Sequence, residues 1–399
     1  MKIRTISSFN ELLALESIWD ELSRDIPFRS FAWLSTWWEC YGDRTSGRHS
    51  SELLVVTVTD EAKNEIVAIA PWYLDRSSSQ GRVIRWLGSG EVCSDYLSVL
   101  CKQDCEAAVA TALGDWLLSD TAPDFDAIQL SGVSDDDTLL HQLIEKLTHS
   151  EITGPAKAAA HRRNGPTCWR LSLPGGWDEY LKLLSKTRRK RARGIVRDWF
   201  EAGRAELVTL SNADDLPEWM ITFEDLHQRR RRSLGQPGCF ASAPFARFLN
   251  EVTPKMFASG KFQFNQLRID GQPVAMDFNL LGNDTVFAYQ GGVDPDSLDH
   301  QPGHLITISQ IRRALDHGIV TYDFLQGDEP YKHNWRAAPT EYVDYRIVPN
   351  RTRAKLTHAL WATKQQARSW ARSAYHVASD VRERTIAAFK GMSRERGPA

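Results

Sequence analysis

Acidic, phenolic and amino side chains crowd one short segment in the second half of the chain. Asp328, Glu329, Tyr331 and Lys332 follow an apolar run, Val320 to Leu325, that predicts a buried strand. Charged groups beside a buried strand cost free energy unless they are solvated or used, and the sites of α/β sheets commonly lie just beyond strand ends. The segment is therefore either an exposed polar loop or part of a reaction site.

A further carboxylate, Asp277, lies in the middle of another predicted strand, between Met276 and Phe278. Desolvation in such surroundings raises the pKa of an isolated carboxylate, and a raised pKa suits a general base. The alternative is an ion pair with Lys332 or Arg336. The candidate catalytic residues are Asp277, Glu329, Tyr331 and Lys332.

The strand predicted at Thr285 to Val293 ends in glycines and leads through a polar loop into a helix that opens at His304. A helix N-terminus presents unpaired backbone N–H groups, to which a phosphate can bind, although many such joints bind nothing. His300 and His304 lack further ligands nearby, so we expect no metal site. The candidate cofactor-binding residues are Tyr289, Gly291, Gly292, Pro302, Gly303 and His304.

A strongly basic face marks the long helix predicted from Trp177 to Ala202. Its basic residues recur at helical spacing, at Lys186, Lys190, Arg193 and Arg197, and extend sideways through Arg188, Arg189 and Arg191. The face is either solvated or binds an anionic ligand. A second run, Arg229 to Arg232, is less informative. The candidate substrate-binding residues are Asp328, Lys186, Arg189 and Lys190.

The elements that position these residues alternate between strands and helices. In the first half, we predict strands at residues 2–7, 53–58, 66–70, 83–87, 96–100 and 125–130, and helices at 12–22, 31–41, 106–118 and 138–147. In the second half, we predict strands at residues 168–173, 262–269, 274–281, 285–293, 321–325 and 342–348, and helices at 177–202, 216–232, 243–258 and 304–317.

This order predicts an α/β (α+β) protein with two similar lobes. Each lobe is expected to be a mixed, mostly antiparallel sheet flanked by helices, and a helical tail follows. The predicted domains are residues 1–160, residues 161–349 and the tail 350–399. A linker-like run from His161 to Pro166 marks the first boundary.

Composition narrows the class of protein. The 399 residues are 42% hydrophobic and 25% charged, which is typical of a globular protein with a sizeable core. A formal net charge of −2 argues against a dedicated nucleic-acid binder, so we expect no DNA partner. We expect no signal peptide and no membrane span. The six cysteines lack metal-binding spacing, which indicates reduced thiols in a cytoplasmic protein.

Two features leave alternatives open. Trp33 and Trp37 lie one helical turn apart, which is typical of a core stripe, although flat aromatic faces also suit sugar rings. The tail carries Leu356, Leu360 and Trp370 near one helical stripe, with basic residues on the other faces. Such a basic amphipathic helix either packs on its own domain or contacts a membrane surface or a synthase complex. A peripheral position at the inner membrane is therefore the alternative to a purely cytoplasmic one.

Several stretches resemble one known family. In the second half they are Tyr289 to Pro295, Pro302 to Leu305 and, most specifically, Tyr322 to Lys332; others are Phe28 to Trp38, Leu87 to Tyr96 and Leu184 to Arg193. They resemble the CelD/BcsL-type family, GNAT-related acetyltransferase-like proteins associated with cellulose and exopolysaccharide biosynthesis. That family is similar in build to the FemAB peptidoglycan aminoacyltransferases. The similarity covers about residues 1–348.

The resemblance implies two GNAT-like lobes, acetyl-CoA as the acyl donor, and a saccharide or saccharide-lipid acceptor. Such a transfer needs a base, for which Asp277 and Glu329 are candidates, and an acid for the leaving thiolate, for which Tyr331 is the candidate. The basic helix would then hold the 3′-phosphate of CoA, a lipid pyrophosphate or tRNA.

The chain departs from the family pattern at one place. The usual acyl-CoA turn reads Gln/Arg-x-x-Gly-x-Gly/Ala, whereas residues 297–304 contain one glycine and a proline. Fewer free N–H groups therefore face a pyrophosphate. Two alternatives stay open: FemAB-like transfer from aminoacyl-tRNA, and a non-catalytic scaffold of a polysaccharide synthase complex.

Overall fold

The first lobe follows the predicted order of elements. The computed structural model describes residues 1–42, 51–76, 80–149, 157–327 and 329–367. The strands of this lobe are β1 (Lys2–Ile6), β2 (Ser51–Asp60), β3 (Glu65–Asp75), β4 (Val83–Trp86), β5 (Leu100–Cys101) and β6 (Ala127–Val133). Its α-helices are α1 (Phe9–Leu13), α2 (Glu16–Leu22), α3 (Phe31–Tyr41), α4 (Glu106–Leu118) and α5 (Thr138–Thr148). The strand predicted at residues 96–100 is wrong over most of its length, because Tyr96 has a left-handed φ of 63°.

The second lobe contains more strands. They are β7 (Ala158–Ser172), β8 (Ala205–Thr209), β9 (Phe262–Ile269), β10 (Gln272–Leu281), β11 (Thr285–Val293), β12 (Thr321–Gln326) and β13 (Ala338–Pro349). The α-helices are α6 (Trp177–Leu183), α7 (Lys186–Ile195), α8 (Leu216–Ser233), α9 (Ala243–Ala258), α10 (Pro302–Asp316) and α11 (Pro330–Asn334).

The single helix predicted over residues 177–202 is wrong. Leu184 is extended, and the hydroxyl of Ser185 accepts a hydrogen bond from the backbone N–H of Arg188 at 3.4 Å. Such an N-cap begins a new helix, α7. A short π-helix, Val196–Glu201, follows it. The basic residues of this region therefore lie on a helix that is separated from α6 and oriented independently of it.

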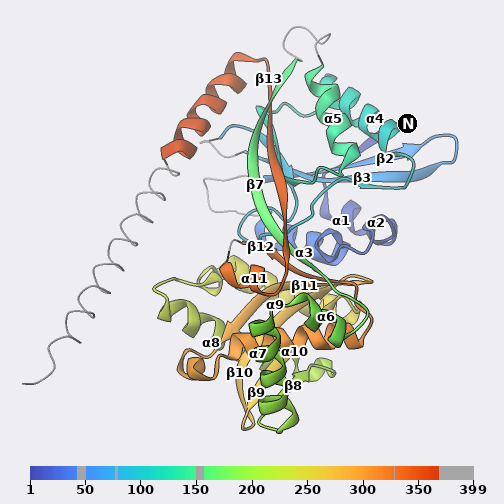
Figure 1. Ribbon diagram of the computed structural model, residues 1–399. Helices are drawn as coiled ribbons and strands as arrows, with labels where there is room; N and C mark the ends of the chain where they lie inside the picture. The colour runs from blue at the N-terminus through green and yellow to red at the C-terminus, as the bar shows by residue number, and fades with distance from the viewer. Residues whose placement is uncertain (43–50, 77–79, 150–156, 328, 368–399) are drawn as a thin grey trace, which may run out of the picture.

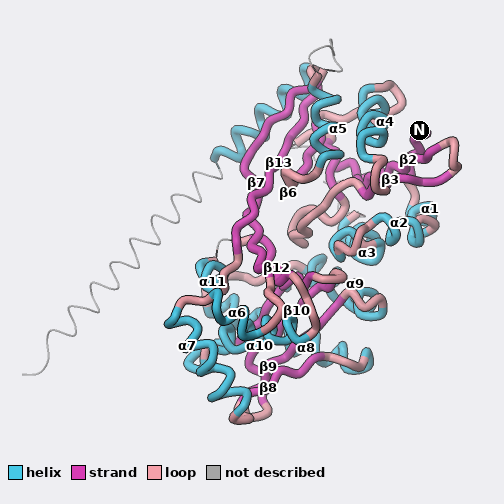
Figure 2. The backbone as a smooth tube through the Cα atoms, turned by 45° about the vertical axis from the view of Figure 1, so that its right-hand side comes forward, coloured by secondary structure: helices cyan, strands magenta, loops and turns pink. Residues whose placement is uncertain are grey.

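One continuous sheet runs through both lobes. The described strands follow the order β1-β2-β3-β4-β6-β13-β7-β12-β11-β10-β9-β8, and β5 pairs with β3. Helices flank this sheet in both lobes, which are stacked one above the other in Figure 1 and remain distinct in the turned view of Figure 2. Most neighbouring strands are antiparallel, whereas β4–β6 and β11–β12 are parallel. The predicted mixed α/β fold class is confirmed.

Strands β7 and β13 join the two lobes. They pair antiparallel from Ala158, opposite Pro349, to Arg170, opposite Ala338, and run side by side between the lobes in Figure 1. On their outer edges, β13 pairs with β6 and β7 pairs with β12. The linker predicted at residues 161–166 is therefore wrong, because this run is strand. Its side chains are largely exposed and polar, which gave a strand the composition of a linker. The division near residue 160 stays a prediction.

Aromatic packing also crosses between the lobes. Trp33 and Trp37 of α3 are buried, so the core interpretation of this pair is confirmed. The Trp33 ring lies 5.3 Å from that of Tyr289 on β11 and 4.9 Å from that of Phe248 on α9, edge to face in both cases. Such pairs contribute about 0.5–1.5 kcal/mol beyond the area they bury. The first lobe is thus anchored on the strand that borders the candidate site.

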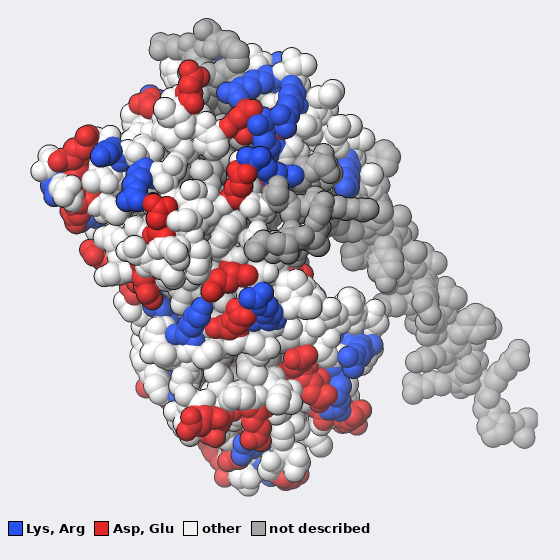
Figure 3. All heavy atoms as spheres, turned by 180° about the vertical axis from the view of Figure 1, so that it is seen from behind, with Lys and Arg blue, Asp and Glu red and all other residues white. Residues whose placement is uncertain are grey.

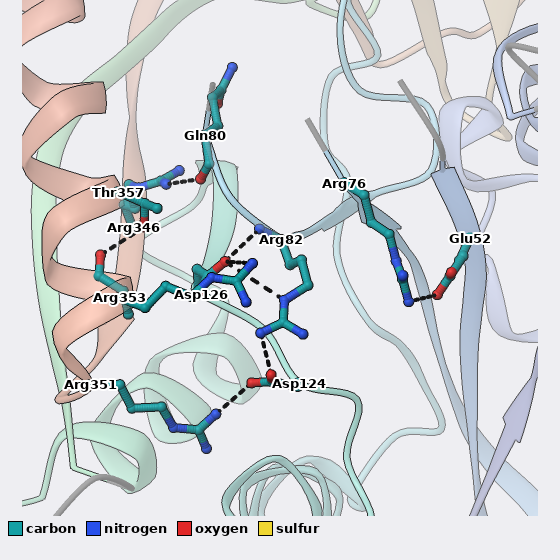
Figure 4. Close-up of polar contacts among 11 residues, drawn as sticks. Glu52, Arg76, Gln80, Arg82, Asp124, Asp126, Arg346, Arg351, Arg353 and Thr357 are labelled. Carbon is teal, nitrogen blue, oxygen red and sulfur yellow. Dashed lines mark hydrogen bonds and ion pairs between the residues drawn. The ribbon is translucent and has the colours of Figure 1, made fainter. Parts of the chain in front are cut away.

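The first part of the C-terminal tail packs on its own chain. Residues 352–367 form a helix. Arg353 forms an ion pair with Asp126 at 3.3 Å (Figure 4), and the Trp361 ring lies 4.5 Å from the guanidinium of Arg346. Leu356 remains exposed on this helix. The rest of the tail lies outside the described residues, and no described helix is long and apolar enough to cross a membrane. Membrane contact stays a prediction.

A buried carboxylate ties the lobes together at the end of β12. Asp323 is fully buried, and its Oδ2 accepts a hydrogen bond from the hydroxyl of Tyr96 in the first lobe. It also lies 3.2 Å from Arg170 Nε, and its Oδ1 accepts from the backbone N–H of Leu325 at 2.8 Å. Burial raises the pKa of Asp323, and the hydrogen bonds and Arg170 oppose that rise. The carboxylate thus links β7, β12 and the first lobe.

Tyr96→Phe should remove one hydrogen bond of this link and lower the free energy of unfolding by about 1–3 kcal/mol, because a buried charged acceptor loses a donor. Chemical denaturation at neutral pH measures the change. Tyr345→Phe is the matched control, since the Tyr345 hydroxyl makes no hydrogen bond within the described part of the chain and should change stability little. Equal effects of the two variants would contradict the role of the Tyr96 hydroxyl.

Candidate active site

The parallel strands β11 and β12 leave an opening in the sheet. They pair from Thr285, opposite Thr321, to Phe287, opposite Asp323, and their later described residues do not pair with each other. A pocket of about 570 Å³ lies beyond this point, between β10, β11 and helices α8, α10 and α11. We call it the splay pocket. It is lined by Arg230, Arg231, Leu234, Asp277, Gly291, Val293, Leu298, Gln301, Pro302, Gly303, His304, Ile306, Thr307, Glu329 and Tyr331.

Asp277 is the central carboxylate of the splay pocket. It lies opposite Gly291 in the β10–β11 register, and a Cβ on Gly291 would come within 3.1 Å of Asp277 Oδ1. The glycine therefore leaves room for the carboxylate. Burial raises the pKa of Asp277 to about 7, and the amide of Gln310 opposes this rise. Asn265 Nδ2 donates to Gln310 Oε1 at 3.0 Å, and the buried Gln310 Nε2 has no hydrogen-bond partner among the described residues.

Tyr331 and Glu329 form the opposite wall. Glu329 precedes α11 and is exposed, and Tyr331 lies in the first turn of that helix. Desolvation, together with the charges of Glu329 and Asp277, raises the pKa of Tyr331. The phenol therefore stays protonated across the pH range in which Asp277 ionises. The pocket thus combines a carboxylate that titrates near neutrality with a phenol that keeps its proton.

Lys332 lies outside the pocket. Its Nζ is buried and donates to the carbonyl oxygens of Leu325, Gln326 and Gly327 at 3.2, 2.9 and 3.1 Å, and it forms an ion pair with Glu329 at 3.0 Å. This ammonium group fixes the turn that follows β12. The donors of Lys332 are used by the backbone and by Glu329, and its catalytic role stays a prediction.

The alternative ion pair of Asp277 is not found either. Lys332 is held by the turn, and Arg336 Nε donates to the carbonyl oxygen of Leu183 at 2.7 Å. Within the described residues, no salt bridge is made by Asp277. The raised pKa of Asp277 follows from this lack of a compensating charge.

The N-terminus of α10 offers few backbone donors. Gln301 precedes it in a left-handed conformation, with φ 55°, and Pro302 has no N–H. The N–H groups of His304 and Leu305 donate to the carbonyl oxygen of Gln301 at 2.9 and 3.2 Å. Gly303 is left with a backbone N–H for a ligand. A phosphate at this entrance would therefore depend on side chains.

Arginine side chains occupy this entrance. Arg191 of α7 donates to Gln301 Oε1 and lies 2.8 Å from His304 Nδ1. Desolvation and the charge of Arg191 lower the pKa of His304, so this imidazole stays neutral at pH 7. Arg230 and Arg231 of α8 line the same pocket. These guanidinium groups can bind phosphate oxygens in place of backbone N–H groups.

Other predicted site residues lie elsewhere. Tyr289 is buried and donates from its hydroxyl to the carbonyl oxygen of Val92 at 2.7 Å. A Cβ on Gly292 would come within 2.9 Å of the backbone nitrogen of His227, so this glycine lets β11 pack on α8. Neither residue lines the splay pocket. Both therefore hold the strand rather than a ligand.

The predicted basic substrate residues are also absent from the pocket wall. Arg189 donates to the carbonyl oxygens of Leu181 and Leu184 at 2.8 and 3.2 Å, which satisfies the C-terminus of α6. Lys186 and Lys190 are exposed and form no salt bridge with any described residue. Asp328 lies outside the described residues.

Sequence reasoning passed over Arg230 and Arg231. They belong to the run Arg229 to Arg232, which ends α8 beside the pocket. Arg229 has a different role, because it forms ion pairs with Asp294 and Asp296 at 2.7 and 2.6 Å and so holds the loop before α10. The signal in the sequence was a cluster of adjacent arginines in which only Arg229 has an acid, Asp225, at helical spacing. This signal does not show which of the arginines face a ligand.

Comparisons with known proteins agree with this geometry. Residues 186–333 match the acetyltransferase (GNAT) domain family. That segment contains the whole splay pocket. The chain carries a GNAT-type acyltransferase domain. The match does not extend to the CelD/BcsL-type family, which stays a prediction.

Solved structures resemble the chain over most of its length. FemX is 11% identical, with a TM-score of 0.61 over 89% of this chain and 99% of that chain. A conserved protein of unknown function from Bacteroides thetaiotaomicron is 12% identical, with a TM-score of 0.51 over 88% and 100%. The C-terminal domain (DUF2156) of a putative lysylphosphatidylglycerol synthetase from Agrobacterium fabrum is 10% identical, with a TM-score of 0.50 over 90% and 96%. These similarities show the fold. No curated protein matches the chain in sequence.

Asp277→Asn should remove the titration at about pH 7 from the activity of the GNAT domain. If Asp277 is the base, native activity rises with pH up to about 7 and then levels off, and the variant loses about 100-fold or more. The pH dependence of thioester consumption measures this. Asp299→Asn, an exposed carboxylate next to the pocket loop, is the control and should keep the native profile.

The same variant tests the pKa through stability. The folded pKa of about 7 lies above the ordinary aspartate value of 3.8, so the native state holds a proton that the unfolded state releases. The free energy of unfolding of the native protein therefore falls as the pH rises from about 4 to about 7. Asp277→Asn should gain stability relative to the native protein between pH 5 and pH 8 in urea unfolding. If the unfolding free energies of Asp277→Asn and the native protein differ by the same amount at pH 5 and at pH 8, the raised pKa is contradicted.

Proposed function

We propose that the protein transfers an acetyl group from acetyl-CoA to a saccharide or saccharide-lipid acceptor in exopolysaccharide or cellulose biosynthesis. The observation that carries the proposal is the splay pocket. It places Asp277, Tyr331 and two arginines around one opening between parallel strands of the GNAT domain. The saccharide acceptor and the biosynthetic role rest on the resemblance of the sequence to the CelD/BcsL-type family.

The residues of the splay pocket fit a phosphate-bearing thioester. Arg230 and Arg231 supply positive charge at its rim, and Arg191 stands beside the start of α10. The inner wall, near Val293 and Ile306, is apolar and suits a pantetheine-like arm. When bound, acetyl-CoA supplies an activated acetyl group. The side chains would hold its phosphates where the proline-containing turn cannot.

Two side chains of the pocket can carry protons in the transfer. Asp277 would accept the proton of the acceptor hydroxyl as its oxygen bonds to the acetyl carbon. Tyr331 would donate its proton to the thiolate sulfur when the carbon–sulfur bond breaks. Glu329 is the weaker candidate for the base, because its carboxylate is exposed and paired with Lys332. The geometry therefore favours Asp277 over Glu329.

Aminoacyl transfer from aminoacyl-tRNA is the second candidate. The specific observation in its favour is the similarity of fold to FemX over 89% of the chain. The face of the molecule in Figure 3 shows Lys and Arg side chains in small groups among Asp and Glu side chains. A tRNA contact usually depends on a broader positive surface than this face presents. The proposal keeps acetyl-CoA as the donor because residues 186–333 match the acetyltransferase (GNAT) domain family.

Titration calorimetry with acetyl-CoA tests the donor. The native protein should bind it, and Arg230→Gln combined with Arg231→Gln should weaken binding about tenfold or more, since charged contacts to phosphate are lost. Arg232→Gln is the matched control, because Arg232 is exposed in the same run and does not line the pocket. Tyr331→Phe should keep its affinity for acetyl-CoA. It should lower the rate at which CoA is released in the transfer reaction, because the thiolate loses its proton donor.

Lack of binding by any acyl-CoA would remove the acetyl-CoA proposal and favour aminoacyl-tRNA. Full acetyl-CoA affinity combined with unchanged polymer acetylation in both Asp277→Asn and Tyr331→Phe would instead favour the non-catalytic scaffold. Circular dichroism of each variant verifies that the fold is kept.

A further inference from the structure

A second pocket lies at the junction of the lobes. Its volume is about 500 Å³. One wall is the loop that follows β4, which belongs to the family-like stretch Leu87 to Tyr96 and has no part in the splay pocket. The loop contributes Ser89, Gly90, Cys93, Ser94, Asp95 and Tyr96. We call it the junction pocket.

The junction pocket and the splay pocket flank one segment of chain. Gln326, the last residue of β12, lines the junction pocket, and its backbone N–H donates to Asp95 Oδ2 at 3.3 Å. Gln326 Nε2 also donates to the carbonyl oxygen of Cys93 at 3.4 Å. Glu329 and Tyr331, shortly after Gln326, line the splay pocket. The end of β12 and the segment that follows it therefore contribute residues to both pockets.

The charges around the junction pocket disfavour an anion. Arg85 is its lining cation, and it is neutralised by Asp75, with Nε 3.0 Å from the carboxylate. Asp344 is paired with Arg163 at 3.0 Å, and Asp95 forms no ion pair among the described residues, while burial raises its pKa to about 7. A phosphate or a nucleotide would meet these carboxylates without a free cation among the described lining residues. The pocket instead suits a neutral ligand or a cationic one.

Side chains that donate or accept hydrogen bonds line the junction pocket. Gln129 and Asp344 come from β6 and β13, and hydroxyl groups come from the loop. Amide and carboxylate oxygens accept hydrogen bonds, and hydroxyl groups both donate and accept. The buried Trp86, which also lines the pocket, has an indole N–H without a hydrogen-bond partner among the described residues. A ligand rich in hydroxyl groups can satisfy this mixture.

We infer that the junction pocket binds a neutral, hydroxyl-rich acceptor, a sugar unit of an oligosaccharide, and that Asp95 positions it by accepting a hydrogen bond from one of its hydroxyl groups. Asp95 is the most buried acid of the wall, with 6% of its surface exposed. The inference rests on the proposed acetyl transfer for its biological meaning. Binding of the sugar, however, is testable without any transfer.

The thiol of Cys93 reports on occupancy, because it is exposed on the wall of the junction pocket. The rate of its alkylation by a maleimide is measured by mass spectrometry of the Cys93 peptide. Neutral oligosaccharides of glucose, galactose and N-acetylglucosamine are the probes, and at least one should slow the reaction about fivefold or more near saturation. Inorganic phosphate and UDP are the anionic probes and should not slow it.

Two bulky substitutions separate the pockets. Ser131→Trp fills the junction pocket, which Ser131 lines, and should abolish protection of Cys93 while acetyl-CoA affinity stays within about twofold of native. Thr307→Trp fills the splay pocket and should show the reverse. Asp95→Asn should weaken protection about tenfold, since an amide NH2 group, which only donates, replaces one of the two oxygens of the carboxyl group.

Three results would overturn the inference. They are protection by phosphate or UDP in place of oligosaccharides, full protection in Ser131→Trp, and no protection by any neutral probe at the highest soluble concentration. Calorimetry with acetyl-CoA on the same preparation reports on the proposed donor independently. Failure of the sugar site and failure of the acetyl-CoA proposal are therefore distinguishable.

Discussion

Two buried charges hold the end of β12, and both lobes depend on them. Asp323 binds Tyr96 of the first lobe and Arg170 of β7, while Lys332 binds successive carbonyl oxygens of the turn that follows. Burying a charge costs free energy unless hydrogen bonds compensate for it. Here each group gains several partners, and the hydrogen bond from Tyr96 to Asp323 requires the lobes to stay in contact. Glu329 follows this turn and pairs with Lys332. The contacts that hold the turn therefore also hold this wall of the splay pocket in place.

Asp277 shows the opposite balance. It is half-buried without an ion pair among the described residues, and desolvation raises its pKa to about 7. Gln310, which is itself held by Asn265 at 3.0 Å, supplies a dipole in place of a charge. A full positive charge would lower the pKa of Asp277 and leave a carboxylate too weak to accept a proton. The fold thus provides Asp323 with a cation and hydrogen-bond donors, whereas Asp277 has no cation beside it among the described residues. This difference is what the proposed role of Asp277 as a base at neutral pH requires.

The parts of the fold that could be predicted were those with local signals. Helix α9 and strands β9 and β11 have the predicted bounds, because apolar periodicity and flanking glycines mark them. Residues 161–166 of β7 were taken for a linker, since strand pairing with β13 is a long-range contact that polar residues do not reveal. For the same reason, the segment around Lys332 was recognised as special while its role was not. Buried ammonium–carbonyl contacts depend on a turn whose shape the sequence does not show.

The phosphate-binding groups at the entrance of the splay pocket affect which acyl donors the pocket can select. Backbone N–H groups at a glycine-rich turn fix a pyrophosphate closely and with little dependence on salt, whereas guanidinium groups attract phosphates over a longer range and are screened by ions. Pro302 removes one backbone donor, and the conformation of Gln301 uses others. Arg191, Arg230 and Arg231 stand where those donors are missing. Charge alone discriminates poorly among phosphorylated donors. Under the proposed function, selectivity would come from the apolar inner wall and from Asp277 and Tyr331, which the proposal assigns to the acyl group rather than to its carrier.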